Sequence, residues 1–202
     1  MMIVRFRTAT IAVAMFAGTA TSQGVPFSQH GTVSQRVSHT DITIEYNRPV
    51  ARGRTLFGAL VKWDTLWHPG ADSATRITFD KDVTFAGKPL PRGEYSVWLI
   101  PRERAPWTLI LSSASRVFHS PYPGEQADVL RVEIAPVRGG HMETLAYYFP
   151  VVGRDSTVLN IHWGETVLPV PIRVSREPQG LTPLHIGQSR QPVPRILDHR
   201  PK

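Results

Sequence analysis

Apolar and polar residues alternate with a period of two along much of this chain. In residues 40–46, Ile42, Ile44 and Tyr46 fall on one side, and the polar Thr43 and Glu45 fall on the other. Successive side chains of a β-strand point to opposite faces of a sheet, so the alternation predicts a strand with one buried face. Further segments typical of strands follow at residues 75–79, 82–101, 107–112, 129–134, 143–151, 156–163 and 166–174.

The segment 82–101 contains two turn signals, Gly87 and the run 91–93, before its last strand. In that strand both faces are apolar, since Val97 and Leu99 share one face and Trp98 lies on the other. A strand with two apolar faces is typical of a position that is covered on both sides. We therefore expect this strand to be central in its sheet.

Near the C-terminal end, the run Trp163-Gly164-Glu165 predicts a tight hairpin between two strands. Pro169 and Pro171 lack a backbone N–H, so they predict that the strand 166–174 lies at an edge. Residues 54–63 are compatible with a helical turn that caps the core with Leu56, Phe57, Leu60 and Val61.

About eight or nine short strands separated by Gly and Pro, with little helix, predict an all-β protein. The expected fold is a single antiparallel β-sandwich of jelly-roll or immunoglobulin-like character. We expect a signal peptide at residues 1–22, a polar lead-in at 23–39, the sandwich at 40–174, and a disordered Pro-rich basic tail at 175–202.

Composition and charge narrow the functional classes. The chain has no Cys, so an exported domain must be stabilised by its core rather than by disulfides. The net charge is +7, but Arg5 and Arg7 fall in the signal peptide, and the tail after residue 174 carries five basic and two acidic residues. The sandwich therefore lacks the concentrated basic face of a nucleic-acid binder. We expect a periplasmic or extracellular protein with no membrane span in the mature chain.

Three runs carry a resemblance to a known family: YNRPVARGR at 46–54, WHPGADSAT at 67–75 and LPRGEY at 90–95. In this order and spacing, the chain is similar to the bacterial domain of unknown function 2911 over roughly residues 28–174. The resemblance implies an exported, β-rich protein and assigns no catalytic residue. His68 stands where the family commonly has Arg, and Asp72 stands where it has Asn.

The first two of these runs predict a cluster of polar and aromatic side chains in two loops. Binding residues gather in the loops at the ends of β-sandwiches. Arginine forks suit carboxylates, phosphates or sugar hydroxyls, and an indole can stack on an apolar ring face. The candidate ligand-binding residues are Tyr46, Arg48, Arg54, Trp67, His68, Asp72 and Thr75.

Three interpretations of this cluster stay open at the level of sequence. The polar groups can order the loops and carry no other role, as in a structural envelope protein. They can bind a small polar or anionic ligand or a glycan. They can also belong to an extracytoplasmic hydrolase with His68 as base or metal ligand and Asp72 beside it. The other histidines have no metal-binding spacing, and the chain lacks phosphate-binding and serine-hydrolase motifs, so no cofactor and no metal site are predicted.

Overall fold

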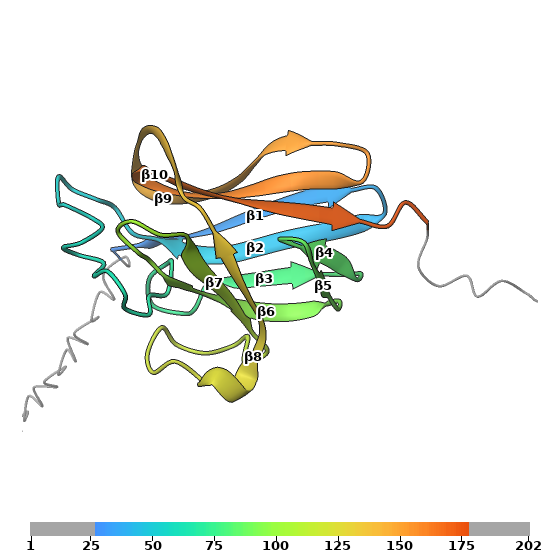
Figure 1. Ribbon diagram of the computed structural model, residues 1–202, viewed down its shortest axis with the longest axis horizontal. Coiled ribbons are helices and arrows are strands. Elements are labelled where there is room, and N and C mark those ends of the chain that lie inside the picture. Colours follow the sequence, from blue (N-terminus) through green and yellow to red (C-terminus); the bar gives the residue numbers. More distant parts are fainter. Residues whose placement is uncertain (1–26, 178–202) are drawn as a thin grey trace, which may run out of the picture.

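The computed structural model describes residues 27–177, which form ten strands in two antiparallel sheets (Figure 1). The larger sheet has the order β1 (Gln29–Val37), β2 (Thr40–Arg48), β3 (Arg76–Phe79), β6 (Gly93–Ile100), β7 (Trp107–Ser112) and β8 (Asp128–Ile134). The smaller sheet has the order β5 (Lys88–Leu90), β4 (Val83–Phe85), β10 (Ser156–Val174) and β9 (Val137–Val152). A 3₁₀ turn, η1 (Glu125–Ala127), precedes β8. The predicted all-β antiparallel sandwich is confirmed.

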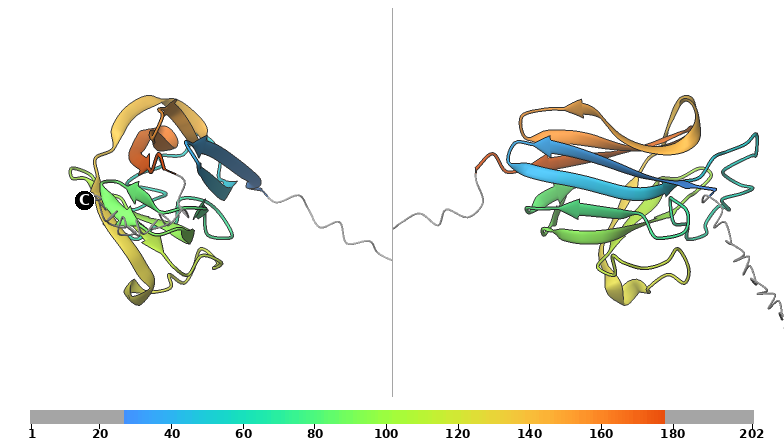
Figure 2. Two further views of the ribbon diagram at one scale, coloured as in Figure 1. Left: turned by 90° about the vertical axis from the view of Figure 1, so that its right-hand side faces the viewer. Right: turned by 180° about the vertical axis from the view of Figure 1, so that it is seen from behind.

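The two sheets form two layers of the sandwich, which the views in Figure 2 show from two further sides. One apolar core lies between them. The inward residues of β2 are buried in this core, and the side chains of Ile42 and Ile44 are fully inaccessible to solvent. Their neighbours Thr43 and Glu45 are only partly buried on the outer face. The period-two pattern of the sequence therefore assigns the faces of this strand correctly.

A second, smaller apolar cluster covers the outer face of the large sheet at β6 and β7. Trp98 and Ile110 are its buried centre, together with Ala74 from the loop before β3. Val117 and Tyr122 from the segment after β7 pack against them. The strand β6 is thus covered on both sides and lies between β3 and β7, as its two apolar faces predict.

The large sheet begins earlier than the sequence pattern indicates. Residues 29–37 fall in the segment predicted as a polar lead-in, yet they form β1, which pairs with β2 along its whole length. The outward positions of β1 are polar, and only Val33 and Val37 among its residues are large and apolar. An edge strand with so few apolar residues gives a weak signal of alternation.

The predicted hairpin at residues 163–165 is wrong, because β10 runs without a break through Gly164. Gly164 has a φ of 57°, and the register with β9 shifts on both sides of it, so it forms a bulge instead of a turn. The partner strand β9 has 16 residues, which lets it pair with both halves of β10.

The predicted edge position of residues 166–174 is also wrong, since β10 lies between β4 and β9. Pairing with β9 ends at Val167, and pairing with β4 begins at Ile172. Pro169 and Pro171 fall between these two ladders, where a missing N–H breaks no ladder hydrogen bond. The carbonyl of Pro171 still accepts the N–H of Ala86 at 2.8 Å.

The long connection between β2 and β3 forms turns at residues 54–63 where a helical turn was expected. The backbone hydrogen bonds of this segment span more residues than those of an α-helix. For example, the N–H of Val61 donates to the carbonyl of Leu56, five residues earlier, at 2.8 Å. Leu56 and Val61 are buried in the core as expected, whereas Leu60 is 46% exposed. This connection projects beyond the strands at one end of the sandwich (cyan in Figure 1).

Two predicted segments, the signal peptide at 1–22 and most of the tail at 175–202, lie outside the described residues. Within residues 27–177, the structure contains no helix long and apolar enough to span a bilayer.

Candidate functional site

The two arginines of the candidate cluster are bound to backbone carbonyls. Arg48 donates from Nε to the carbonyl of Leu145 on β9 at 3.1 Å. Arg54 donates to the carbonyls of Val50 and Ala51 at 2.6 and 2.9 Å. These bonds fix the start of the β2–β3 connection, which is the ordering role that a guanidinium fork performs well.

The two aromatic residues of the cluster belong to the core. The ring of Trp67 stacks on Trp163 with centroids 5.9 Å apart and planes 15° apart. The backbone of Trp67 exchanges two hydrogen bonds with Leu99 at 2.7 and 2.8 Å. Tyr46 packs edge-on against Tyr147 at 4.6 Å, and its hydroxyl oxygen accepts the Tyr147 N–H at 3.2 Å. Both rings are therefore engaged in packing within the protein.

His68 and Thr75 form a buried polar network beneath the surface. The Nε2 atom of His68 accepts the backbone N–H of Thr75, so the neutral ring carries its proton on Nδ1. Burial, together with the nearby His119, lowers the pKa of His68 from 6.5 to about 3. The Thr75 hydroxyl donates to the carbonyl of Pro69 at 2.9 Å, and the Tyr147 hydroxyl donates to the same carbonyl at 2.8 Å.

This network leaves His68 poorly suited to the roles that the hydrolase interpretation requires. Its side chain is only 5% exposed, and its acceptor nitrogen is occupied by Thr75. Asp72 is exposed and has a φ of 59°, and its backbone carbonyl accepts the N–H of His119 at 2.9 Å. Among residues 27–177, no three His, Cys, Asp or Glu side chains are grouped so that they could hold a metal ion.

Gly70 closes the loop around the His68 network, and the contacts leave no room for a side chain. A Cβ atom at this position would lie 2.6 Å from His68 Cε1 and 2.6 Å from Thr75 Oγ1. We expect Gly70→Ala to lower the free energy of unfolding by about 1–3 kcal/mol, the usual cost of overpacking. Urea denaturation followed by circular dichroism measures this change.

The matched control is Gly140→Ala in β9, because a Cβ atom there would meet nothing within 4 Å. The control protein should be as stable as the wild type or slightly more stable, since alanine reduces the entropy of the unfolded chain. Equal stability of the two variants would contradict the close packing at Gly70.

The seven candidate residues therefore do not line one common cavity. Tyr46 borders a cavity on the outer side of the large sheet, Trp67 borders a narrow gap in the core, and Arg54 borders a hollow at the end of the sandwich. The polar groups of Arg48, His68 and Thr75 are engaged by the protein's own backbone. For most of the cluster, the structure supports the interpretation that these groups order the loops.

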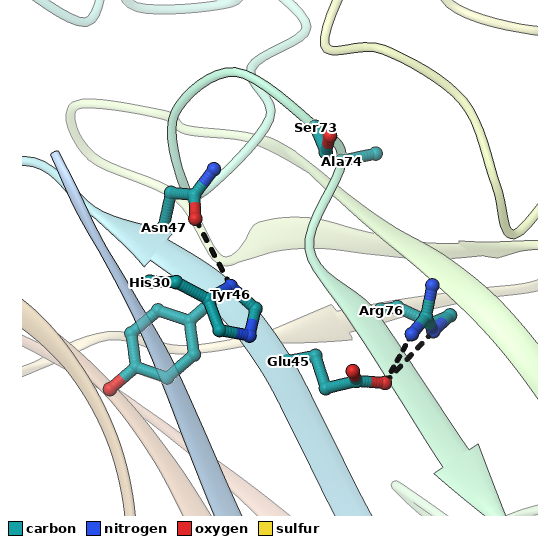
Figure 3. Close-up of a pocket in the computed structure, with 7 residues that line it drawn as sticks. All are labelled: His30, Glu45, Tyr46, Asn47, Ser73, Ala74 and Arg76. Atoms are coloured by element: carbon teal, nitrogen blue, oxygen red, sulfur yellow. Dashed lines mark hydrogen bonds and ion pairs between the residues drawn. The ribbon is translucent and has the colours of Figure 1, made fainter. Parts of the chain in front are cut away.

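A different set of residues does converge on an open pocket (Figure 3). This pocket, which we call the polar pocket, has a volume of about 300 Å³ and lies where β1, β2 and β3 meet the loop before β3. It is lined by His30, Glu45, Tyr46, Asn47, Ser73, Ala74 and Arg76. Only Tyr46 among them belongs to the predicted cluster.

The strand register explains why these side chains meet. His30 of β1 lies opposite Asn47 of β2, and Glu45 of β2 lies opposite Arg76 of β3. Cross-strand neighbours on one face of a sheet have Cβ atoms about 4.5–5.5 Å apart, so their side chains interact directly. Ser73 reaches the same place from the loop, whose residue Ala74 is buried in the cluster around Trp98.

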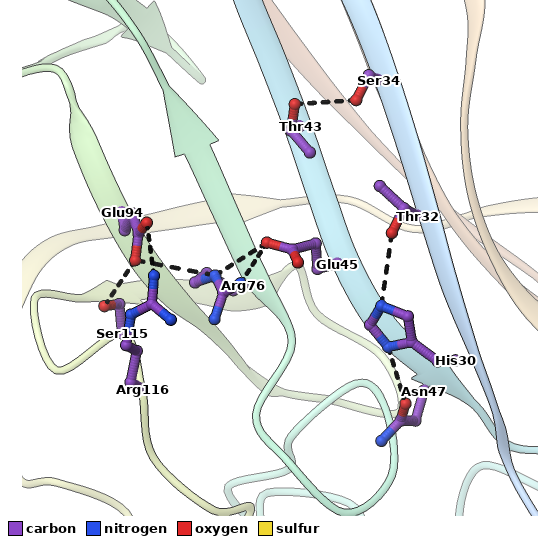
Figure 4. Close-up of polar contacts among 10 residues, drawn as sticks. All are labelled: His30, Thr32, Ser34, Thr43, Glu45, Asn47, Arg76, Glu94, Ser115 and Arg116. Carbon is purple, nitrogen blue, oxygen red and sulfur yellow. Dashed lines mark hydrogen bonds and ion pairs between the residues drawn. The ribbon is translucent and has the colours of Figure 1, made fainter.

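A chain of charged groups crosses this face of the sheet (Figure 4). Arg76 pairs with Glu45 through Nε at 3.1 Å and through Nη2, and its Nε also lies 3.8 Å from Glu94. Glu94 in turn accepts Arg116 Nη2 at 3.1 Å and the Ser115 hydroxyl at 3.5 Å. Two carboxylates thus share two guanidinium groups, and the network as a whole carries no excess charge.

The opposite wall of the pocket is held by an imidazole, an amide and a hydroxyl. His30 Nδ1 contacts Asn47 Oδ1 at 3.2 Å, so this nitrogen carries the donated proton when the amide oxygen accepts. Asn47 Nδ2 donates to the carbonyl of Ala71 at 3.1 Å, which ties the strand to the loop. The Thr32 hydroxyl lies 3.5 Å from His30 Nε2.

Several polar atoms of the polar pocket keep unused hydrogen-bonding capacity. Within the part of the chain that the structure describes, Arg76 Nη1, Glu45 Oε1 and the Ser73 hydroxyl make no hydrogen bond to protein. A donor, an acceptor and a hydroxyl that serves as both therefore face one hollow. Such a set suits a ligand that itself presents donors and acceptors close together.

Sequence reasoning missed this pocket, although one signal for it was present. The outward positions of β2 read Thr43, Glu45 and Asn47, and Arg76 is the outward residue at the start of β3. Alternation alone assigns such residues to a solvated face. Only the pairing of β2 with β3 and of β1 with β2 brings them together.

Comparison with known proteins identifies the family of this chain and nothing more specific. The model of one protein family, described as "Protein of unknown function (DUF2911)", matches residues 28–172. No curated protein and no solved structure matches the chain.

Proposed function

The chain belongs to the DUF2911 family of proteins of unknown function, and we propose that it is an exported binding module whose polar pocket takes a small neutral, hydroxyl-rich ligand such as a sugar unit. One observation carries this proposal. Arg76, Glu45 and Ser73 line the same open hollow of about 300 Å³, and within residues 27–177 each keeps a polar atom that makes no hydrogen bond to protein: a guanidinium N–H, a carboxylate oxygen and a hydroxyl. The exported location rests on the N-terminal sequence, with its basic start and short apolar run.

The charge balance favours a neutral ligand over an anion. Arg76, which would bind an anion, already faces two carboxylates, Glu45 and Glu94. An anion would have to displace Glu45 or lie beside it, and like charges repel strongly when they are close and partly desolvated. Vicinal hydroxyls avoid this repulsion, because they accept from the guanidinium group and donate to the carboxylate at the same time.

We expect Glu45→Gln and Ser73→Ala each to weaken binding about tenfold or more. The first replaces a charged acceptor of a ligand hydroxyl by a weaker neutral amide, and the second removes a hydroxyl partner altogether. Isothermal titration calorimetry with a panel of neutral mono- and disaccharides, and with phosphate, sulfate and citrate as anionic probes, measures the effect. The neutral sugars should include a binder, and the anions should bind more weakly than that sugar.

The chain offers a matched control for the Glu45 change. Asp41 lies on the same face of β2 and pairs with Arg36 of the neighbouring strand β1, and neither residue lines the pocket. Asp41→Asn makes the same chemical change and should leave sugar binding as it is. Three results would contradict the proposal: no binder in the panel, tighter binding of anions than of sugars, or equal effects of Glu45→Gln and Asp41→Asn.

A further inference from the structure

At the end of the sandwich, two hollows meet at a single tryptophan. One, of about 310 Å³, lies between the β6–β7 connection and the start of β9, and is bordered by Trp107, Arg102 and Arg138. The other, of about 370 Å³, is bordered by residues that include Phe57 and Trp163. Both hollows share Trp63, Glu165 and Thr166 in their walls. We call the pair of hollows the Trp63 groove.

We propose that the Trp63 groove is a second binding site, separate from the polar pocket, that binds an oligosaccharide of neutral pyranose units with Trp63 as its stacking platform. Trp63 is only partly buried and lies between the two hollows, so its ring is accessible from the groove. The face of a pyranose ring is apolar and its rim carries hydroxyls. An aromatic face bordered by polar groups matches both features.

The position of Trp63 is fixed before any ligand arrives. Its ring stacks on Phe57 at 6.2 Å with planes 24° apart, and it meets Trp107 edge-on at 6.4 Å. Gly58 has a φ of 87°, and a Cβ atom there would lie 2.6 Å from the indole nitrogen, so the turn presses directly against the ring. A platform that is already ordered loses little entropy when a ligand binds.

Charged groups of both signs surround the platform. Arg138 pairs with Glu165 at 2.8 Å, and Arg102 lies 3.5 Å from Glu133. Arg54, which borders the second hollow, donates two hydrogen bonds to backbone carbonyls. The walls of the groove contain three arginines and two carboxylates, namely Arg54, Arg102, Arg138, Glu103 and Glu165. Because both signs are present, the groove offers donors and acceptors to a polyhydroxyl chain without the single-sign field that would select a polyanion.

The two hollows lie on both sides of Trp63, so we infer a ligand longer than one sugar unit. The affinity should therefore rise with chain length. Cellohexaose, laminarihexaose and maltohexaose serve as probes, with the corresponding disaccharides and glucose as short members of each series. Binding is followed by calorimetry and by the tryptophan fluorescence of the wild-type protein, and at least one hexaose should bind more tightly than its own short members.

Substitution of the platform tests the stacking directly. Trp63→Ala should weaken hexaose binding by about tenfold or more, whereas Trp63→Phe should retain part of it. Circular dichroism and urea denaturation establish that the variants are folded. Glu165→Gln, a change on an exposed side chain, replaces one charged acceptor oxygen at the rim by an amide N–H without touching the core, and it should weaken binding severalfold.

The test separates this site from the polar pocket. Glu45→Gln should leave hexaose binding in the Trp63 groove unchanged, and Trp63→Phe should leave binding in the polar pocket unchanged. The proposal is overturned if no hexaose binds, if affinity is independent of chain length, or if folded Trp63→Ala and Glu165→Gln proteins bind as the wild type does.

Discussion

Replacing Trp98 by alanine is expected to lower the free energy of unfolding by about 3–5 kcal/mol, the usual cost of removing a fully buried aromatic side chain. Trp98 is 1% exposed and centres the apolar cluster on the outer face of β6. Its indole N–H donates to the Ser96 hydroxyl at 2.9 Å, and its ring lies edge-on to Tyr122 at 5.1 Å. Urea denaturation followed by circular dichroism measures the loss.

Two control variants show whether the loss comes from this packing. Trp98→Phe keeps most of the buried area and should cost less than Trp98→Ala. Phe118 lies in the segment after β7 and is 55% exposed. Phe118→Ala should therefore change the free energy of unfolding by no more than about 0.5 kcal/mol. Equal losses in Trp98→Ala and Phe118→Ala would contradict the assignment of Trp98 to a second core.

Acid is expected to destabilise the protein through His68. The unfolded chain binds a proton at this residue below its ordinary pKa of 6.5, whereas burial lowers the pKa of the folded state to about 3. Between these values the unfolded state holds more protons, so stability falls as the pH falls. The contribution of His68 is about 1.4 kcal/mol for each pH unit within this window, and it is absent above the unfolded pKa.

The comparison of wild type with His68→Gln isolates this effect from the carboxylates, which titrate in both proteins. Glutamine offers an acceptor to the Thr75 N–H and carries no titrating group. The difference in the free energy of unfolding between the two proteins should change between pH 7 and pH 4.5. Over this range the wild type should lose about 2–3 kcal/mol more than the variant loses. His39→Gln, at an exposed position, is the control and should show no such movement. A gap that is constant with pH would show that His68 titrates alike in both states.

The sequence predicts most of the fold because burial and alternation agree along the strands. β2, β3, β6, β7 and β8 each carry an apolar face that a period of two reveals. The wrong predictions at β1 and β10 concern residues whose apolar and polar pattern does not identify the structure. A polar edge strand has little alternation, and a glycine in a long strand resembles a glycine in a turn until the partner strand is known.

The candidate site was harder to predict, for a related reason. Arg48, Trp67 and His68 stand in a dense polar and aromatic run, but density in sequence does not show whether a group is already bonded within the protein. The polar pocket combines residues from β1, β2 and β3 that are far apart in the chain. Their meeting depends on strand register, which a single sequence does not specify.

A nuclear magnetic resonance titration of the ¹⁵N-labelled wild-type protein tests most directly whether the polar pocket binds a neutral polyhydroxyl ligand. The titrant is the tightest-binding mono- or disaccharide from the calorimetric panel. The account predicts that the largest shift changes cluster at Glu45, Ser73 and Arg76, and that Asp41→Asn leaves this pattern intact. Shift changes that avoid these three residues, or a protein whose spectrum no sugar of the panel alters, would contradict it.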